Sequence, residues 1–207
     1  MILGIEAAST DLSVAVVDRD GSVLHSDGWS VAPRRSHELL RRLQEALERA
    51  GGNLDEVTGI GVGLGPGSFT GLRVGLSVAK GLAFALDCPI VGVPSLSAWL
   101  ASEPDAHAAA SRAGANEAYL LMRGDDEPRV VDRAQLQAAS GRLVTPTELA
   151  EAFGLTDTLP PLRAATAVAS MAAHQLTNDS AGADLDRLEP IYVRAPRGVG
   201  QSAGEVG

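Results

Sequence analysis

The sequence predicts an α/β fold built on a mixed β-sheet, and three observations lead to this prediction. Short β-rich runs open the chain, apolar positions with helical spacing follow, and further strands and helices then alternate. Strands that follow one another directly form antiparallel pairs, whereas strands joined through a helix form parallel pairs. A sheet that combines both kinds of pair is therefore expected.

The opening of the chain is expected to form three antiparallel strands. Residues 2–8 and 12–18 are rich in aliphatic and β-branched side chains, and residues 22–29 form the third run. The segment RDG at 19–21 is a turn signal that folds the third run back against the second.

Helices and strands alternate after these strands. Leucine and alanine recur with helical spacing from Ser36, and Gly51 supplies the stop. Next we expect a buried strand at 60–64, a helix at 69–86, a strand at 89–93 and a helix capped by Ser95 that runs to Leu100. The order β-β-β-α-β-α-β-α matches a ribonuclease H-like domain better than a doubly wound Rossmann sheet.

The character of the sequence changes near residue 101. The segment SEPDAHAAASRAGAN is small, polar and alanine-rich and has the periodicity of neither helix nor strand, so a domain boundary is placed there. We expect a first half over residues 1–103, a second, smaller half over residues 104–195, and a flexible tail over residues 196–207.

The second half carries weaker signals. We expect a hairpin over 117–132, a helix that starts with a capping box at 145–148 and stops at Gly154, an alanine-rich helix over 162–175, and an extended segment over 188–194.

Composition narrows the class of protein. There are 26 acidic and 17 basic residues, for a net charge of −9, and aromatic residues make up 3% of the chain. Such a chain repels nucleic-acid backbones and lacks a base-stacking platform. The single cysteine, the absence of a basic leader and the absence of an apolar run of about 20 residues predict a cytoplasmic protein without a membrane segment.

The glycine-rich stretch GVGLGPGSFTGLRVGLSVAKGLA, residues 61–83, raises the question of phosphate binding. A Walker A loop fails because Leu72 follows Gly71 and Gly81 follows Lys80. The dinucleotide fingerprint and the nucleophile elbow fail as well. What remains is a strand-to-helix turn with Ser68 or Thr70 as a cap, which we favour over an anion site.

The helix after this loop carries small residues on one face. Gly71, Gly75, Ala79 and Ala83 recur every four residues, so another backbone is expected to approach them closely. Spacing alone leaves open whether that backbone belongs to a partner or to the chain's own sheet.

The sequence resembles the TsaB (YeaZ) family of tRNA threonylcarbamoyladenosine biosynthesis. The similar segments are GLGPGSFTGLRVGLSVAKGLA (63–83), PIVGVPSLSA (89–98), RRSHELL (34–40) and ILGIEAASTDLSVAVVD (2–18). The resemblance implies an actin-like or Hsp70-like ATPase fold, made of two ribonuclease H-like halves with mixed sheets, of which the second is smaller and degenerate.

The resemblance also implies a function. Members of the family are non-catalytic scaffold subunits that bind and stabilise the TsaD-like transferase, which modifies the adenosine beside the anticodon, and a TsaE-like ATPase joins them. The chain would form a homodimer when alone, reach tRNA through the complex and hold no cofactor of its own, while the complex uses ATP and magnesium.

Two sets of residues follow from the resemblance. The partner interface would comprise Phe69, Gly71, Leu72, Arg73, Gly75, Leu76 and Ala79. A residual nucleotide site would comprise Glu6, Ser9, Thr10, Gly65, Gly67 and Ser68, with Glu6 where active members of the superfamily carry an aspartate. No catalytic residue and no metal site are expected, because the four histidines do not form an H-x-x-x-H pair.

The second half departs from the family pattern. The segment SRAGANEAYL keeps Glu117 and Tyr119 of the family's DARRGEVY-like segment, and the apolar strand expected before it is missing. A kinase-like or acyl-transferring enzyme that uses Glu6, Ser9, Thr10 and the loop at 65–71 is the alternative function. A peptidase finds no support in the residues.

Overall fold

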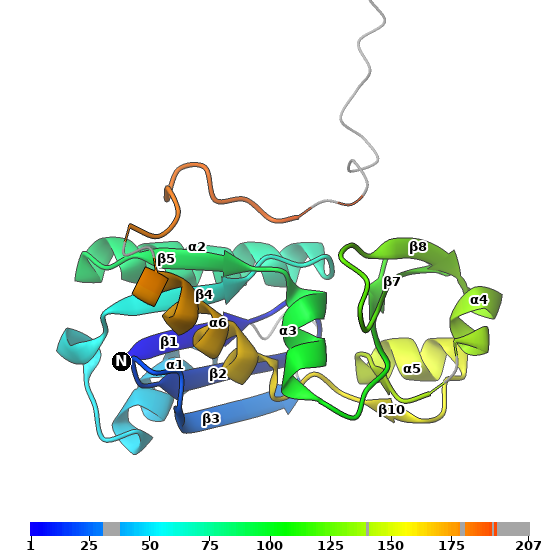
Figure 1. Ribbon diagram of the computed structural model, residues 1–207, viewed down its shortest axis with the longest axis horizontal. Helices are drawn as coiled ribbons and strands as arrows, with labels where there is room; N and C mark the ends of the chain where they lie inside the picture. The colour runs from blue at the N-terminus through cyan, green and yellow to red at the C-terminus, as the bar shows by residue number, and fades with distance from the viewer. Residues whose placement is uncertain (31–37, 140, 179–180, 192, 194–207) are drawn as a thin grey trace, which may run out of the picture.

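The computed structural model describes residues 1–30, 38–139, 141–178, 181–191 and 193, and within them the chain forms two five-stranded mixed sheets. In Figure 1 the first sheet, sheet A, lies on the left and the second, sheet B, on the right. The predicted fold class, two halves with mixed sheets, is confirmed.

Sheet A has the strand order β3-β2-β1-β4-β5. Its strands are β1 (Ile2–Glu6), β2 (Asp11–Val17), β3 (Val23–Ser30), β4 (Gly59–Gly63) and β5 (Ile90–Val93). The three opening strands pair antiparallel, and β1, β4 and β5 pair parallel. Helices α1 (Glu38–Arg49) and α2 (Phe69–Leu86) bury their apolar faces on one side of this sheet, as the helical spacing predicts. The short helix η1 (Leu54–Glu56) precedes β4.

Sheet B repeats the same topology with the order β8-β7-β6-β9-β10. Its strands are β6 (Ala108–Arg112), β7 (Glu117–Met122), β8 (Arg129–Asp132), β9 (Leu143–Val144) and β10 (Thr158–Leu159). Helices α4 (Arg133–Ala138) and α5 (Thr147–Phe153) pack on one of its faces. Each half therefore follows the order β-β-β-α-β-α-β-α, and the predicted hairpin of β7 and β8 is confirmed.

The last helix of each half packs on the sheet of the other half. Helix α3 (Ser95–Ser102) lies between the halves in Figure 1, and its Trp99 is buried with residues of β6 and β7. Helix α6 (Ala164–Asn178) crosses back and covers the face of sheet A opposite α1 and α2. Of the predicted second half, residues 104–195, the α6 portion thus lies on sheet A.

Helix α6 approaches sheet A unusually closely. A methyl carbon placed on Gly4 of β1 would lie 2.3 Å from the carbonyl oxygen of Ala165, and one placed on Gly61 of β4 would lie 2.8 Å from Cβ of Ala172. Strand residues without side chains thus face helix residues with the smallest side chains. The alanines of α6 and the glycines of the strands together make this close approach possible.

Buried hydrogen bonds of polar side chains also join the two halves at α5 and at β6. The Asp11 carboxylate at the start of β2 is 1% exposed and accepts a hydrogen bond from Thr147 N at the start of α5, at 3.0 Å. Its other oxygen accepts one from Ser30 Oγ. Ser111 Oγ of β6 donates to the carbonyl of Pro66 at 2.8 Å. Because these groups are buried, each unmade bond would carry a desolvation cost.

Two details of the second half differ from the prediction. Residues 108–112, read as a loosened segment without a strand, form the buried central strand β6 of sheet B. Alanine has a weak preference for strands, and burial on both faces of the sheet outweighs that preference here. Helix α5 begins at Thr147 after Pro146 and has no side-chain cap, so the predicted capping box is wrong, whereas Gly154 does end the helix in a left-handed conformation.

Other expectations have mixed outcomes. Ser95 is the first residue of α3 and does not cap it, because its hydroxyl accepts a hydrogen bond from Gly65 N instead. Of the segment at 188–194, the described residues form no strand, although Ile191 N donates to the Leu64 carbonyl. The expected tail at 196–207 and the start of the first helix at Ser36 lie outside the described residues.

Among the described helices, α2 is the one whose length and apolar composition would allow it to cross a membrane, with a mean hydropathy of 1.3. The inner helices of globular proteins meet the same criterion. In this fold α2 buries Leu76, Ala79 and Ala83 against its own sheet.

The contact between α6 and sheet A leads to a testable expectation. Gly4→Ala should lower the free energy of unfolding by about 1–3 kcal/mol, because the added methyl carbon meets the α6 backbone. Gly81→Ala on α2 is the matched control. No atom lies within 4 Å of its new methyl carbon, so this change should raise the free energy of unfolding by about 0.5–1 kcal/mol. Urea denaturation measures both changes, and equal effects at the two positions would contradict the packing argument.

Candidate functional site

The candidate nucleotide site lies where β1 turns into β2, and Glu6 is its central residue. Glu6 ends β1 and its side chain is fully buried. Its Oε1 accepts a hydrogen bond from Ala8 N at 2.7 Å, and its Oε2 has no hydrogen-bond partner within the described residues. Gly63 of β4 makes room for this side chain, since a methyl carbon there would lie 2.1 Å from Oε2.

Burial changes the acidity of Glu6. Loss of hydration raises the pKa of its carboxyl from 4.5 to about 7, because burial penalises the charged form. The backbone amides of Ala8 and Ala7 and the side chains of Ser95 and Trp99 favour the charged form and offset only part of this effect. A carboxyl group in this state is a proton carrier near neutral pH and a weaker cation ligand than an exposed carboxylate.

The remaining polar groups of the turn bond to one another. Ser9 is buried, its hydroxyl donates to the carbonyl of Asp11 at 2.9 Å, and it accepts from Asp11 N at 3.1 Å. Thr10, between them, is half-buried. Asp11 had not been singled out from the sequence, and its position directly after the turn was the available signal.

The glycine loop lies directly on this turn. Ser68 N donates to the carbonyl of Ala8 at 2.6 Å, and a methyl carbon on Gly67 would lie 2.1 Å from the same oxygen. Gly65 N donates to Ser95 Oγ, and Gly71 N donates to Ser68 Oγ, the cap of α2. A phosphate cradle needs free backbone amides, and the amides of Gly65, Ser68 and Gly71 are already engaged by the protein. The cap that Ser68 was expected to provide is confirmed.

The small-residue face of α2 turns inward. Gly75 is buried, and a methyl carbon there would lie 3.0 Å from Cβ of Ala7; on Gly71 it would lie 2.1 Å from the Ala7 carbonyl oxygen. The backbone that approaches this face is therefore the chain's own. Of the residues expected at the partner interface, Leu72, Gly75, Leu76 and Ala79 are buried in this way, Gly71 is half-buried, and Phe69 and Arg73 are exposed.

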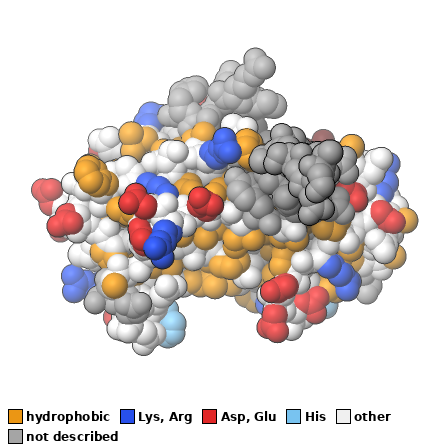
Figure 2. All heavy atoms as spheres, turned by 90° about the horizontal axis from the view of Figure 1, so that it is seen from above, with side chains coloured by type: hydrophobic (Ala, Val, Ile, Leu, Met, Phe, Trp, Pro, Cys, Tyr) orange, Lys and Arg blue, Asp and Glu red, His pale blue; other side chains and the backbone are white. Residues whose placement is uncertain are grey.

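The outward face of α2 forms a separate surface, which we call the α2 outer stripe. It consists of the exposed residues Phe69, Arg73, Ser77, Gly81 and Phe84. Phe84 is 81% exposed and Phe69 is 48% exposed, and the guanidinium of Arg73 lies 3.9 Å from the centre of the Phe69 ring. Figure 2 views the molecule from the side on which α2 lies in Figure 1 and shows apolar patches among the charged side chains. The sequence reasoning missed Phe84, although its spacing from Phe69 and Arg73 places it on their face.

The histidine, cysteine and acidic side chains bear on whether the protein holds a metal ion. Within the part of the chain that the structure describes, no three of the His, Cys, Asp and Glu side chains come together in a group suited to a metal ion. His37 lies outside that part.

The buried Glu6 predicts a pH dependence of stability. The folded state holds a proton between about pH 4.5 and about pH 7 that the unfolded state releases, so the free energy of unfolding should fall as the pH rises through this window. The loss is up to about 3 kcal/mol, at about 1.4 kcal/mol for each unit of pKa shift. Glu6→Gln should remove this slope, and Glu151→Gln, an exposed change on α5, should keep it. Denaturation at a series of pH values measures the slopes, and parallel curves for the wild type and Glu6→Gln would refute the assignment.

The chain matches known proteins over most of its length. A family model described as "TsaD: tRNA N6-adenosine threonylcarbamoyltransferase" matches residues 30–157. The tRNA threonylcarbamoyladenosine biosynthesis protein TsaB of Escherichia coli is 36% identical over 96 residues, which is 46% of this chain and 40% of that protein. TsaB of Haemophilus influenzae is 33% identical over 121 residues, which is 58% of this chain and 50% of that protein. The matches thus span half or less of the length of these curated relatives.

A solved structure agrees in fold. YeaZ from Pseudomonas aeruginosa superimposes with a TM-score of 0.68 at 23% identity, over 93% of this chain and 99% of that one. The resemblance drawn from the sequence segments is confirmed by these matches. The chain therefore belongs to the family described by the TsaD model, is similar to the TsaB (YeaZ) proteins, and has the two-lobed actin-like fold.

Proposed function

We propose that the chain acts in the formation of N6-threonylcarbamoyladenosine in tRNA, as a non-catalytic subunit that binds a TsaD-like transferase through the α2 outer stripe. The observation that carries this proposal is the division of α2 into two faces. One face is buried on sheet A, and the α2 outer stripe presents two exposed phenylalanines and one arginine, without an acidic side chain. Exposed aromatic and arginine side chains on a rigid helix are typical of binding hot spots.

Family membership supports the proposed process and the proposed partner. The matched relatives carry the name of tRNA threonylcarbamoyladenosine biosynthesis, and the family model carries the name of the transferase. A TsaE-like ATPase is the third expected component, and the complex would use ATP and magnesium. The chain would reach tRNA only through the complex, because its net charge of −9 disfavours direct binding. The complex would act in the cytoplasm.

The state of the nucleotide site supports a non-catalytic role. Glu6 is buried, Ser9 bonds to the neighbouring Asp11, and the loop amides of Gly65 and Ser68 donate to protein groups. A nucleotide at this site would have to break these bonds before it could form its own.

A kinase-like or acyl-transferring enzyme remains the alternative, and one observation favours it. A buried carboxyl with a pKa near 7, such as Glu6, is suited to general acid or base chemistry. Calorimetry with ATP and magnesium distinguishes the two: the enzyme hypothesis requires a saturable affinity that Glu6→Ala abolishes, and the scaffold hypothesis requires none for the isolated chain.

The partner surface can be tested with a single charge. Phe84→Glu should reduce the affinity for the TsaD-like protein by at least about tenfold, because a carboxylate replaces the most exposed apolar side chain of the proposed interface. Its fold should remain intact, since Phe84 is 81% exposed. Binding is measured by surface plasmon resonance with purified partners.

The matched control is Met171→Glu, which changes an apolar residue, 39% exposed, on the helix that covers the opposite face of sheet A. It should bind like the wild type. Unchanged binding by Phe84→Glu would move the interface away from α2. Gly75→Leu is unsuitable as a probe, because its side chain would collide with β1 and disturb the fold.

The role in tRNA modification is tested by reconstitution. Purified TsaD-like and TsaE-like proteins, threonylcarbamoyl donor and tRNA should yield the modified adenosine only when the chain is added, as measured by mass spectrometry of nucleosides. The chain alone should modify no tRNA. Modification by the isolated chain would overturn the scaffold role, and equal modification without the chain would overturn its participation.

A further inference from the structure

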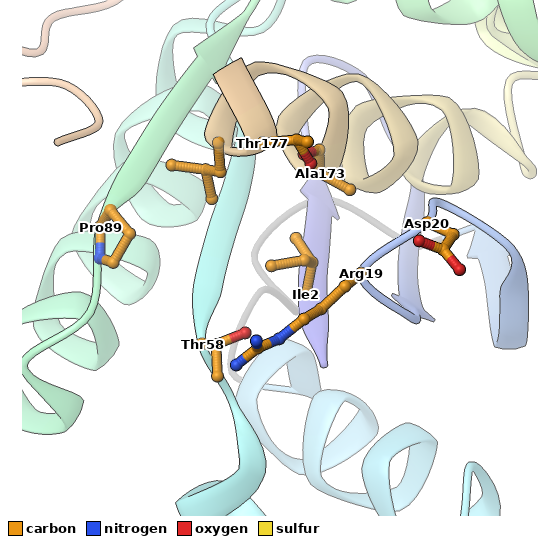
Figure 3. A pocket seen from close by; sticks show the side chains of 8 residues that line it. Ile2, Arg19, Asp20, Thr58, Pro89, Ala173 and Thr177 are labelled. Carbon is orange, nitrogen blue, oxygen red and sulfur yellow. The ribbon is translucent and has the colours of Figure 1, made fainter. Parts of the chain in front are cut away.

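A cavity lies at the opposite end of sheet A from Glu6. It has a volume of about 510 Å³ and is formed where β1, β4 and β5 begin and where β2 ends. Figure 3 shows α6 above it and the start of β5 beside it. Its lining residues are Ile2, Arg19, Asp20, Thr58, Pro89, Ala173, Leu176 and Thr177. Volumes of this size are usual for small-molecule sites.

The inner wall of the cavity is apolar. Ile2 and Ala173 are buried, and Leu176 packs on the same cluster. Gly59 of β4 helps to keep the space open. A methyl carbon there would lie 2.4 Å from Cδ1 of Leu176 and 2.9 Å from Cδ1 of Ile2. Both side chains therefore occupy the space that a larger residue at this position would fill, and they extend less far into the cavity.

The polar side of the cavity is dominated by one cation. In Figure 3 Arg19 extends from the turn after β2 across the start of β1 and points toward Thr58, whereas Asp20 points away from it. Within the described residues the Arg19 guanidinium has no ion pair, hydrogen bond or ring contact. A guanidinium has several donors and binds a carboxylate through two of them at once.

Two hydroxyl groups complete the polar side. Thr58 Oγ1 donates only a long hydrogen bond to the Met1 carbonyl, at 3.3 Å, so it can turn toward a ligand. Thr177 Oγ1 donates to the Ala173 carbonyl at 2.9 Å and keeps its acceptor capacity. One cation, one adjustable hydroxyl and an apolar wall suit a single negative charge on an apolar body.

We propose that this cavity binds a small aliphatic monocarboxylate, with its carboxylate on Arg19 and its hydrocarbon chain against Ile2, Ala173 and Leu176. Polyphosphates are disfavoured, because the cavity offers one cation and also holds Asp20. The site is independent of the proposed scaffold role, since the α2 outer stripe lies on the opposite face of sheet A from α6.

The experiment uses hexanoate, hexanamide and inorganic phosphate as probes of the full chain in a buffer without carboxylates. Hexanoate should bind saturably in a calorimetric titration and should shift the backbone amide signals of Thr58 and Thr177. Hexanamide, which has the same chain without the charge, should bind at least about tenfold more weakly, the loss expected for one charged hydrogen bond. Phosphate should bind more weakly than hexanoate.

The matched variants are Arg19→Gln and Arg49→Gln, two exposed arginines of which the second lies at the end of α1. Arg19→Gln should reduce the affinity for hexanoate to that for hexanamide, and Arg49→Gln should leave it unchanged. The proposal is overturned if hexanoate does not bind, if hexanamide or phosphate binds as tightly, or if Arg19→Gln binds hexanoate like the wild type.

Discussion

The contact between α6 and the glycine-bearing face of sheet A is the constraint on which the rest of the structure depends. Helix α6 follows the last strand of sheet B, so its packing on Gly4 and Gly61 joins the two ends of the chain. Helix α3 makes the reciprocal contact with sheet B through Trp99. Because each half supplies a helix that the other half needs, neither sheet is covered on both faces until the whole chain has folded.

The polar residues of the β1–β2 turn form hydrogen bonds at the junction of the halves. Asp11 joins β2 to the start of α5, and Ser9 closes the turn with hydrogen bonds to Asp11. Glu6 is the exception, because Oε2 is buried without a hydrogen-bond partner among the described residues. Burial raises the pKa of the Glu6 carboxyl to about 7, because the charged form loses its hydration there. Under the proposed function, this buried acid belongs to a nucleotide site that has become part of the structure.

Helix α2 has one face that packs on sheet A and one face that is exposed, and the proposed function places binding on the exposed face. The small residues Gly71 and Gly75 allow the helix to lie close to Ala7, which fixes its depth in the protein. The residues on the opposite side do not pack on the sheet, so Phe84 and Arg73 can be exposed without loss of packing. A rigid helix that presents aromatic side chains loses little conformational entropy when a partner binds.

The sequence alone determined the types of the helices and strands in the first half, because apolar periodicity and turn residues are local signals. It also determined the family, through segments that resemble the family's own. The boundaries of α2 and the stop at Gly154 follow from such signals. Strand β6 escaped prediction, since an alanine run has no strand-like pattern and only burial within sheet B makes it extended. The tertiary structure likewise decided which face of α2 is exposed, that α6 returns to sheet A, and that Glu6 is buried. Each of these depends on contacts between residues far apart in the chain. Local sequence patterns do not specify which distant residues come into contact.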